Sequence, residues 1–476
     1  MTTSRAVAGT RRRADGGVDL DVDAIADLAA GGHPPDDDRL AEILAKARSL
    51  AGLELSEAAA LLEVRDPAAR EHVWEAAREV KRAIYGPRMV LFAPLYASNE
   101  CTNNCLYCAF RADNTELARR TLTMEEIARE TRAIEDLGHK RILLVAGQTP
   151  KTDARYAADA VRTIYATRSE RGEIRRVNVN MAPPPVDELR LLKEAGIGTY
   201  QCFQETYHPE QYRRLHPSGP KADYRWRLEV MDRAFAAGID DVGMGVLLGL
   251  HDYRFDVLAL LAHAEYLDRR YGVGPHTLSF PRIEPAQNAP AALDIPCPVS
   301  DDELMMIVAV LRLSCPYTGI IMSTRESPPL RRALAGLGVS QLSAGSRTYP
   351  GAYSDGRAHV EDREQFALGD TRPLDAVIRD LADNGHVPSF CTACYRLGRT
   401  GQEFMDKAKP GEIQHFCTPN AILTFQEYLE DYADDETRAA GLGVVEATLA
   451  DVLPSLRPTV EKRVAQIRAG QRDLYF

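Results

Sequence analysis

Short apolar and β-branched runs recur along the middle of the chain and predict eight β-strands. Helical segments separate successive runs. Strands that alternate with helices predict parallel pairing, and eight such units are the number in a (β/α)8 barrel, an α/β fold. An open doubly wound sheet is the alternative, because spacing alone does not establish closure. The eight runs cover residues 88–96, 140–147, 174–183, 199–206, 240–249, 276–283, 318–326 and 339–347.

Two of the intervening helices begin with a recognisable signal. Thr123 and Glu126 lie three residues apart just before one helical pattern, and Ser300 and Glu303 do so before another. In such a capping box, each side chain bonds a main-chain N–H that the first helical turn leaves without a partner. We therefore expect helices to begin at these two places.

The segments on either side of the barrel pattern differ from it. Residues 1–36 are rich in Gly, Asp and Arg without apolar periodicity, so we expect a largely disordered lead-in. Residues 37–86 carry apolar side chains at a spacing of three to four and predict N-terminal helices. The barrel is expected over residues 87–385. Residues 386–476 are expected to form a C-terminal extension with further helices.

The composition fits a large α/β protein and argues against several other classes. Of the 476 residues, 45% are hydrophobic, which suffices for a sizeable core. The formal net charge of -11 argues against binding to nucleic acid or to an anionic membrane. No apolar run approaches the roughly 20 residues that cross a bilayer. The sequence after Arg11–Arg13 is acidic, unlike a signal peptide, so we expect a cytoplasmic protein.

Six of the nine cysteines fall into two groups. In a reducing cytoplasm, grouped thiols indicate a metal site or catalysis rather than disulfides. The other three, Cys202, Cys297 and Cys315, are scattered along the chain. We interpret these three as small buried apolar residues, the usual role of a free cysteine.

Cys101, Cys105 and Cys108 have the spacing C-x3-C-x2-C and follow the first predicted strand. In a barrel, that position is the C-terminal face, where catalytic residues lie. Thiolates select zinc, copper or iron–sulfur clusters, and a structural zinc site needs four ligands. Because there are three thiols and no adjacent histidine, the pattern favours a 4Fe-4S cluster with one iron open to a small molecule. A zinc knuckle is the alternative.

Cys391, Cys394 and Cys417 have the spacing C-x2-C-x22-C in the C-terminal extension. Spacing alone favours a zinc site with His415 as a fourth ligand, because structural zinc is the usual occupant of C-x2-C units. A second iron–sulfur cluster with an open iron is the other interpretation.

The first cysteine group, with the aromatic Tyr107 before its last cysteine, resembles the motif of the radical S-adenosylmethionine (SAM) superfamily. Within that superfamily, other segments resemble the tyrosine lyases of the FeFe-hydrogenase maturase HydG family. The resemblance runs from about residue 37 to residue 435 and includes the second cysteine group, so it favours a second cluster over zinc there. The segments are LFAPLYASNECTNNCLYCAF, RRVNVNMAP, GIGTYQCFQETYH, GPHTLSFPR, PYTGIIMSTRESP, SQLSAGSRT and FCTACYRLGRTG.

This resemblance implies a reaction. A 4Fe-4S cluster on the first group would cleave SAM to a 5′-deoxyadenosyl radical, which attacks L-tyrosine and breaks its Cα–Cβ bond to give p-cresol and dehydroglycine. The fragment would then become carbon monoxide and cyanide at a second iron–sulfur cluster, for assembly of the hydrogenase H-cluster. The implied partners are a reducing electron donor such as flavodoxin or ferredoxin, and other maturation proteins.

Two other functions stay open at this point. One is a tyrosine lyase of the 2-iminoacetate synthase type, which serves thiamine or specialised metabolism without forming carbon monoxide or cyanide. The other is a zinc-stabilised scaffold or binding protein.

The resemblance also implies residues that contact the cofactor and the metal. The expected SAM contacts lie in the first cysteine loop and near the ends of the second, third and fourth strands. They are Tyr107, Gln148, Asn178, Asn180 and Glu205. His276, at the start of the sixth predicted strand, is expected to ligate an extra iron of the second cluster, since neutral imidazole is a common iron ligand.

A zwitterionic tyrosine needs a cation for its carboxylate. A planar guanidinium suits this role because it makes two parallel hydrogen bonds to one carboxylate. The ends of the last two predicted strands offer suitable side chains. We expect Arg325, Ser343 and Arg347 to bind the substrate.

Three residues depart from the family pattern. Gln148 stands where a glutamate is usual, which keeps an acceptor but loses the charge-assisted part of the hydrogen bond. Glu100 precedes the first cysteine where an aromatic residue is usual, and Glu284 replaces an expected basic residue. These departures raise the prospect of a divergent branch in which the tyrosine fragment has another fate.

Overall fold

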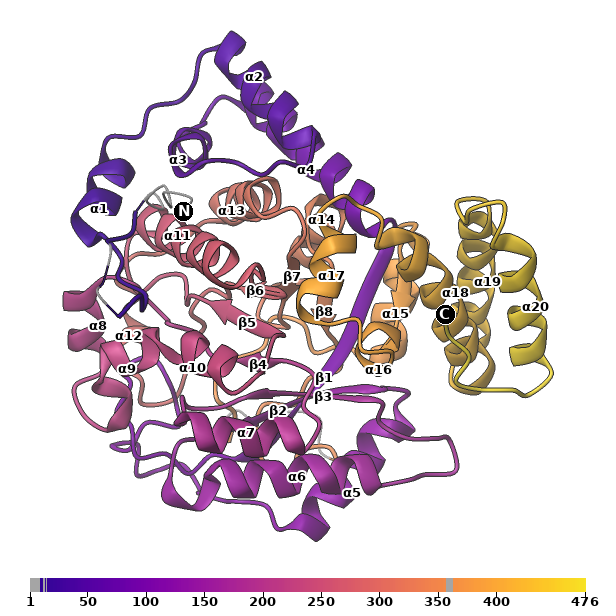
Figure 1. The fold of residues 1–476 in the computed structure, drawn as a ribbon. Helices are drawn as coiled ribbons and strands as arrows, with labels where there is room; N and C mark the ends of the chain where they lie inside the picture. The colour runs from indigo at the N-terminus through magenta and orange to yellow at the C-terminus, as the bar shows by residue number, and fades with distance from the viewer. Residues whose placement is uncertain (1–8, 12, 14, 357–362) are drawn as a thin grey trace.

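The computed structural model describes residues 9–11, 13, 15–356 and 363–476. Eight parallel strands form a closed barrel, because β1 pairs with both β2 and β8 (Figure 1). The prediction of a (β/α)8 barrel is therefore confirmed. The strands are β1 (Arg88–Ser98), β2 (Arg141–Ala146), β3 (Arg176–Asn180), β4 (Tyr200–Gln201), β5 (Val242–Gly245), β6 (Thr277–Ser279), β7 (Gly319–Met322) and β8 (Gln341–Ser343).

A ninth strand, β9 (Val387–Ser389), extends this sheet and was not predicted. It pairs in parallel with the beginning of β1, where Arg88 lies opposite Val387 and Val90 opposite Ser389. Three residues that include Pro388 give no strand signal in the sequence, because proline is uncommon in paired strands. Through β9, the C-terminal region is hydrogen-bonded to the barrel.

Helices surround the barrel and fill the connections between its strands. Both predicted capping boxes are present, at Thr123 before α5 and at Ser300 before α13. The larger helices are α5 (Met124–Asp136), α6 (Ala154–Ala166), α7 (Val186–Glu194), α10 (Val230–Ala236), α11 (Tyr253–Tyr271), α13 (Asp301–Ser314), α14 (Pro328–Leu337) and α15 (Leu374–Asp383). Shorter ones are η1 (Pro150–Thr152), α8 (Pro209–Leu215), η2 (Pro220–Ala222), α9 (Tyr224–Leu228) and α12 (Pro290–Leu293).

The N-terminal region packs on α11 and α13. It forms α1 (Val22–Ala30), α2 (Asp37–Arg48), α3 (Leu55–Leu62) and α4 (Pro67–Tyr85). Residues 1–8, 12 and 14 lie outside the described residues, but α1 shows that the expected disorder of 1–36 was wrong in part. Ile25 and Ala29 lie one turn apart and are buried, and Asp21 caps the helix. The many acidic residues around these two positions hide the helical pattern.

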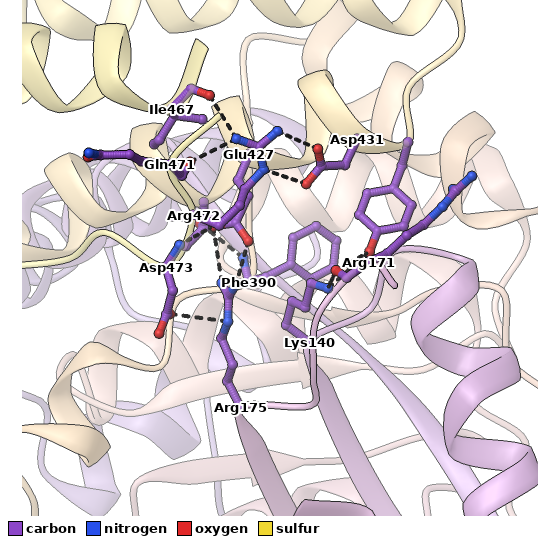
Figure 2. Close-up of polar contacts among 12 residues, drawn as sticks. Lys140, Arg171, Arg175, Phe390, Glu427, Asp431, Ile467, Gln471, Arg472 and Asp473 are labelled. Atoms are coloured by element: carbon purple, nitrogen blue, oxygen red, sulfur yellow. Dashed lines mark hydrogen bonds and ion pairs between the residues drawn. The ribbon is translucent and has the colours of Figure 1, made fainter. Parts of the chain in front are cut away.

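The C-terminal region lies beside the start of β1 and next to α15 (Figure 1). It forms α16 (Ala393–Arg396), α17 (Gly401–Ala408), α18 (Gln414–Asp431), α19 (Asp435–Leu449) and α20 (Arg457–Arg468). Figure 2 shows ion pairs that join it to the barrel, among them Arg175 with Glu427. Among the described residues, no helix is both long and apolar enough to cross a membrane.

The scattered cysteines divide into two kinds. Cys202 and Cys315 are buried, as expected of small apolar residues. Cys297, in the loop before α13, is only partly buried, so the expectation was wrong for this residue. Its main-chain N–H donates to the carbonyl of Gly249, and the residues on either side of it, Pro296 and Pro298, are exposed.

Arg312 on α13 offers a test of the packing at the N-terminal end of the barrel. Its fully buried guanidinium donates to the carbonyls of Pro316, Gly338 and Thr318 at 2.7–3.1 Å. Arg312→Met leaves these carbonyls without a donor, so we expect the free energy of unfolding to fall by roughly 2–4 kcal/mol. Urea denaturation followed by circular dichroism measures this change.

Arg332→Met is the matched control. Arg332 is half exposed and pairs with Asp380, and an exposed ion pair contributes at most about 1 kcal/mol. Equal losses for the two variants would contradict the structural role of Arg312.

Candidate active site

Three cysteine thiols meet a cavity at the C-terminal end of the barrel strands. The loop after β1 carries Cys101, Cys105 and Cys108, and all three line a cavity of about 250 Å³. Side chains from the ends of other strands complete its wall. This is the end at which (β/α)8 enzymes carry their catalytic residues.

The guanidinium of Arg119 holds the cysteine loop together. It donates to the carbonyls of Asn99 at 2.7 Å, Phe110 at 2.9 Å, Arg111 at 2.6 Å and Asn114 at 2.8 Å. These four carbonyls lie before and after the three cysteines. One side chain thus closes the loop, and it places a positive charge close to the thiols.

Gly147 lets the cysteine loop lie directly against the end of β2. The Thr102 N–H donates to the Gln148 carbonyl at 2.8 Å, and the Gly147 N–H donates to the Ser98 carbonyl at 3.0 Å. A Cβ atom on Gly147 would come within 2.2 Å of the Glu100 carbonyl oxygen. Only glycine permits this approach.

The three thiols are suited to a 4Fe-4S cluster. Across the described ranges, no three Cys, His, Asp or Glu side chains are grouped as the ligands of one metal ion would be. A 4Fe-4S cluster binds each thiolate on a separate iron, so its ligands need not converge on one point. Burial raises the pKa of Cys105 and raises that of Cys108 to about 12, so both thiols are protonated until iron displaces the proton.

Four of the five expected SAM contacts line the cavity, namely Tyr107, Gln148, Asn180 and Glu205. The Gln148 Oε1 accepts from Asn103 Nδ2 at 2.7 Å, which ties it to the cysteine loop. Asn178 is not among the described residues that line the cavity. Its side-chain oxygen accepts from the Arg176 Nε and from the Thr199 N–H, nearer the start of β3.

Glu205 has a strained backbone and two cationic partners. Its φ of 74° lies in the left-handed region, which costs free energy for a residue other than glycine and is frequent at functional sites. Its carboxylate lies 2.6 Å from Lys221 Nζ and 3.5 Å from Arg227 Nη2. Burial acts to raise the pKa of Glu205, but the positive charges of Lys221 and Arg227 outweigh burial and lower the pKa below its usual value. The group is therefore an ionised carboxylate.

Two of the three expected substrate residues, Arg325 and Ser343, line the cavity. The Arg325 guanidinium lies 3.4 Å from the centre of the Phe366 ring, and its Nη1 donates to the Arg282 carbonyl at 3.3 Å. Arg347 is not among the described residues of the cavity wall. Its main-chain N–H donates to Tyr353 instead.

Two cavity-lining hydroxyls have unused hydrogen-bonding capacity. Ser346 Oγ and Thr348 Oγ1 are buried and have no hydrogen-bond partner in the part of the chain that the structure describes. A buried polar atom without a partner costs about 1–3 kcal/mol, so these atoms fit a polar ligand. They lie in the segment after β8, next to Ser343.

The sequence pattern did not identify several residues of this wall. Lys221 and Arg227 belong to the connection between β4 and β5, and Gln365 follows β8 by more than twenty residues. Gln365 donates to Cys108 Sγ at 3.5 Å and accepts from the Tyr96 hydroxyl at 2.7 Å. Loop positions without periodicity or spacing carry no local signal for such contacts.

The second cysteine group lies at the opposite end of the barrel. Cys391 follows β9, Cys394 is on α16 and Cys417 is on α18. Arg141, the first residue of β2, donates from Nη1 to the Cys391 carbonyl at 2.6 Å. Cys394 and Cys417 pack against an apolar cluster that includes Tyr85 and Phe404.

The two histidines considered for this group differ in placement. His276 lies at the start of β6, and its ring centre is 4.5 Å from that of Phe404, so it borders the same apolar cluster. Burial lowers the pKa of His276 to about 4, and the imidazole is therefore neutral, as a metal ligand must be. His415 lies two residues before Cys417 on α18, and side chains two apart on a helix do not face each other.

Comparisons with known proteins agree with this architecture. The Radical SAM superfamily model matches residues 95–264, and the model of the Biotin and Thiamin Synthesis associated domain matches residues 279–387. The 2-iminoacetate synthase of Escherichia coli (strain K12) is 33% identical over 335 residues, which are 70% of this chain and 85% of that protein. The chain therefore belongs to the radical SAM family that includes this 2-iminoacetate synthase.

Two solved structures extend the similarity over the C-terminal region. A crystal structure of HydG, a maturase of the [FeFe]-hydrogenase, has a TM-score of 0.91 and 45% identity, and the match covers 95% of this chain and 99% of that one. HydG from Carboxydothermus hydrogenoformans has a TM-score of 0.81 and 41% identity, covering 94% of this chain and 97% of that one. The chain is thus a radical SAM enzyme with a HydG-like structure, which argues against a zinc-stabilised scaffold.

The three departures from the family pattern lie around the cavity of this radical SAM enzyme. Gln148 lines it, as described above. Glu100 directly precedes Cys101, and its carboxylate pairs with Lys151 Nζ at 2.7 Å. Glu284 is half-buried near Arg325, and burial together with Glu326 raises its pKa to about 6. None of the three disturbs the cysteine loop.

Gly147→Ala tests the close approach of β2 to the cysteine loop. The added methyl group must push Glu100 and the adjoining Cys101 away, so we expect the first group to lose its iron, about four atoms per chain. Iron and sulfide analysis of anaerobically purified protein measures the loss.

Gly336→Ala is the control for this substitution. Nothing lies within 4 Å of a Cβ on Gly336, which is inside α14, so its iron content should match the wild type. Full iron content in Gly147→Ala would show that the loop does not need this contact.

Proposed function

We propose that this enzyme cleaves the Cα–Cβ bond of L-tyrosine to p-cresol and dehydroglycine and converts the fragment to carbon monoxide and cyanide at a second iron–sulfur cluster, for FeFe-hydrogenase H-cluster assembly. The observation that carries the proposal is the pair of cysteine groups at opposite ends of one barrel, in a chain 45% identical to HydG over 95% of its length. The 2-iminoacetate synthase relatives support the tyrosine cleavage.

The residues present suit a 4Fe-4S cluster and SAM at the first group. Cys101, Cys105 and Cys108 would hold the cluster, and Tyr107, Gln148, Asn180 and Glu205 would contact SAM. The bound cluster supplies the electron that cleaves SAM. That electron comes from a reducing donor such as flavodoxin or ferredoxin, in keeping with a cytoplasmic protein that acts with other maturation proteins.

The far side of the cavity suits an amino acid. The Phe366 ring packs against the Arg325 guanidinium, whose N–H groups can make two parallel bonds to a carboxylate. Ser343 and the hydroxyls of Ser346 and Thr348 complete a polar pocket. Four aromatic side chains also line the wall and help to exclude water from a reactive intermediate. They are Phe92, Tyr96, Phe110 and Phe203.

The second function to consider is tyrosine cleavage alone, as in 2-iminoacetate synthase. The 33% identity to that enzyme and the Glu100, Gln148 and Glu284 departures favour it. The second cysteine group favours the longer reaction, because three thiols and the neutral His276 supply soft ligands for an iron–sulfur cluster.

Product analysis separates the two functions. Anaerobic turnover with SAM, L-tyrosine and dithionite should release p-cresol, and trapping should recover cyanide and carbon monoxide in comparable amounts. About eight irons per chain are expected for two clusters. Release of p-cresol without carbon monoxide or cyanide would leave the 2-iminoacetate synthase type of reaction, and absence of p-cresol would overturn both.

Arg325→Lys tests the substrate carboxylate site. A lysine cannot make two parallel bonds, so we expect the KM for tyrosine in p-cresol release to rise by about 10-fold to 100-fold while SAM affinity is retained. Arg347→Lys, outside the cavity wall, is the matched control and should change this KM by less than about threefold. Similar effects of the two changes would disprove the assignment.

Gln148→Glu tests the SAM turn. A charged acceptor strengthens a hydrogen bond to a cation about twofold, so we expect SAM to bind about three to ten times more tightly. Equilibrium binding of SAM measures this, with the KM for tyrosine as the internal control. Weaker SAM binding would place Gln148 away from the positive part of SAM.

A further inference from the structure

The last six residues of the chain, 471–476, lie against both segments that carry the second cysteine group, and we call them the clasp. One segment, residues 391–399, contains Cys391 and Cys394. The other is α18, which contains Cys417. These segments are far enough apart in the sequence that local structure does not fix their separation.

The clasp accepts hydrogen bonds from two arginines of the first segment. Arg396, two residues after Cys394, donates from Nη1 and Nη2 to the two oxygens of Asp473 at 2.6 and 2.7 Å. Arg399 donates from Nη2 to the Phe476 main-chain oxygen at 2.7 Å. The Arg399 main-chain N–H in turn donates to the Cys394 carbonyl at 2.8 Å. Parallel bonds of this kind fix orientation as well as distance.

The clasp donates hydrogen bonds to three side chains on α18. Asn420, one turn after Cys417, is buried and accepts from the Phe476 N–H at 2.8 Å. Glu427 accepts from the Asp473 N–H at 3.1 Å. Asp431 takes two bonds from the Arg472 guanidinium at 2.5 and 2.7 Å (Figure 2). One face of α18 is thus bonded to the clasp from its cysteine end onward.

The same contacts reach the barrel. Arg175, just before β3, forms a buried ion pair with Glu427 and lies 3.1 Å from Asp473 Oδ1 (Figure 2). Asp473 therefore stands between Arg175 and Arg396. It has a φ of 62°, a left-handed backbone that an aspartate adopts at a cost and that turns its side chain between these two arginines.

We propose that the clasp sets the separation between the 391–399 segment and α18, and so positions Cys391, Cys394 and Cys417 for a cluster. This inference rests on the second cluster of the proposed function. A cluster needs its thiols at fixed places. α16 is four residues long and its N-terminus lacks a side-chain cap, so it cannot orient Cys394 alone. Tyr395 ties this segment to the barrel by donating to the Gly196 carbonyl at 2.6 Å, and the Phe390 N–H donates to Thr424 Oγ1 on α18 at 3.2 Å. The clasp adds the contacts that join the part of the segment beyond Cys394 to α18.

Deletion of residues 471–476 and the milder Asp473→Asn variant test the proposal. Asp473→Asn keeps the shape but loses the charge that faces Arg175 and Arg396. Each holoenzyme is purified anaerobically, and iron, sulfide and the electron paramagnetic resonance of the reduced clusters are measured. We expect the deletion to lose about four irons per chain and the second-cluster signal, and Asp473→Asn to lose part of both.

Release of p-cresol reports on the first cluster, so it should stay within about twofold of wild type in both variants. Arg379→Gln is the matched control, because it breaks an ion pair between α15 and the exposed Glu436 on α19, away from both cysteine segments. It should retain all its iron. A deletion variant with full iron and an unchanged second-cluster signal would overturn the proposal.

If the wild-type protein contains about four irons and shows one cluster signal in electron paramagnetic resonance, the second cluster is refuted. The clasp is then tested in the protein without iron. Hydrogen exchange should speed up by about tenfold or more in residues 391–399 when the clasp is deleted, with the β1 amides unchanged. Unchanged exchange in residues 391–399 would show that the clasp does not hold this segment.

Discussion

Both cysteine groups depend on the pairing of one strand, β1. This strand has 11 residues. Its first residues pair with β9, its middle residues pair with β8, and its last residues pair with β2. Cys101 lies three residues after the end of β1, and Cys391 lies two residues after the end of β9, the strand paired with the first residues of β1. The part of β1 beyond its pairing with β9, residues 91–98, spans roughly 25 Å at about 3.3 Å per residue and keeps the two groups apart. A closed parallel barrel does not stretch, so this separation is fixed.

Cations, buried or partly buried, accompany the thiols at both ends of the barrel. Arg119 bonds four carbonyls around the first group, and Arg141 bonds the Cys391 carbonyl in the second. At the second group, burial acts to lower the pKa of Arg88, but the nearby Cys417 and Tyr85 raise it above its usual value. A cation beside thiolates offsets the cost of removing negative charge from water. The protein thus supplies a positive surrounding for each thiol group before any iron binds.

The sequence predicted what depends on local pattern and spacing. Alternating strands and helices identified the barrel, and three close cysteines identified the catalytic end. Contacts made over long distances in the chain gave no such signal. β9 is recognisable only by its pairing with β1, and Gln365 reaches Cys108 from a segment far along the chain. Asn178 is the opposite case. Its position on the third strand predicted that it would line the cavity, but its side chain bonds Arg176 and Thr199 instead.

The pairing of β9 with β1 has a consequence for protein engineering. Val387–Ser389 begin the C-terminal region but belong to the barrel sheet. The C-terminal region is therefore not a separate domain that can be moved by itself. A chimera that joins it to the barrel of a lyase with a single cysteine group must pair β9 with the first strand of that barrel in the same register. A cut between α15 and β9 therefore falls inside the sheet and not at a boundary between two independent units.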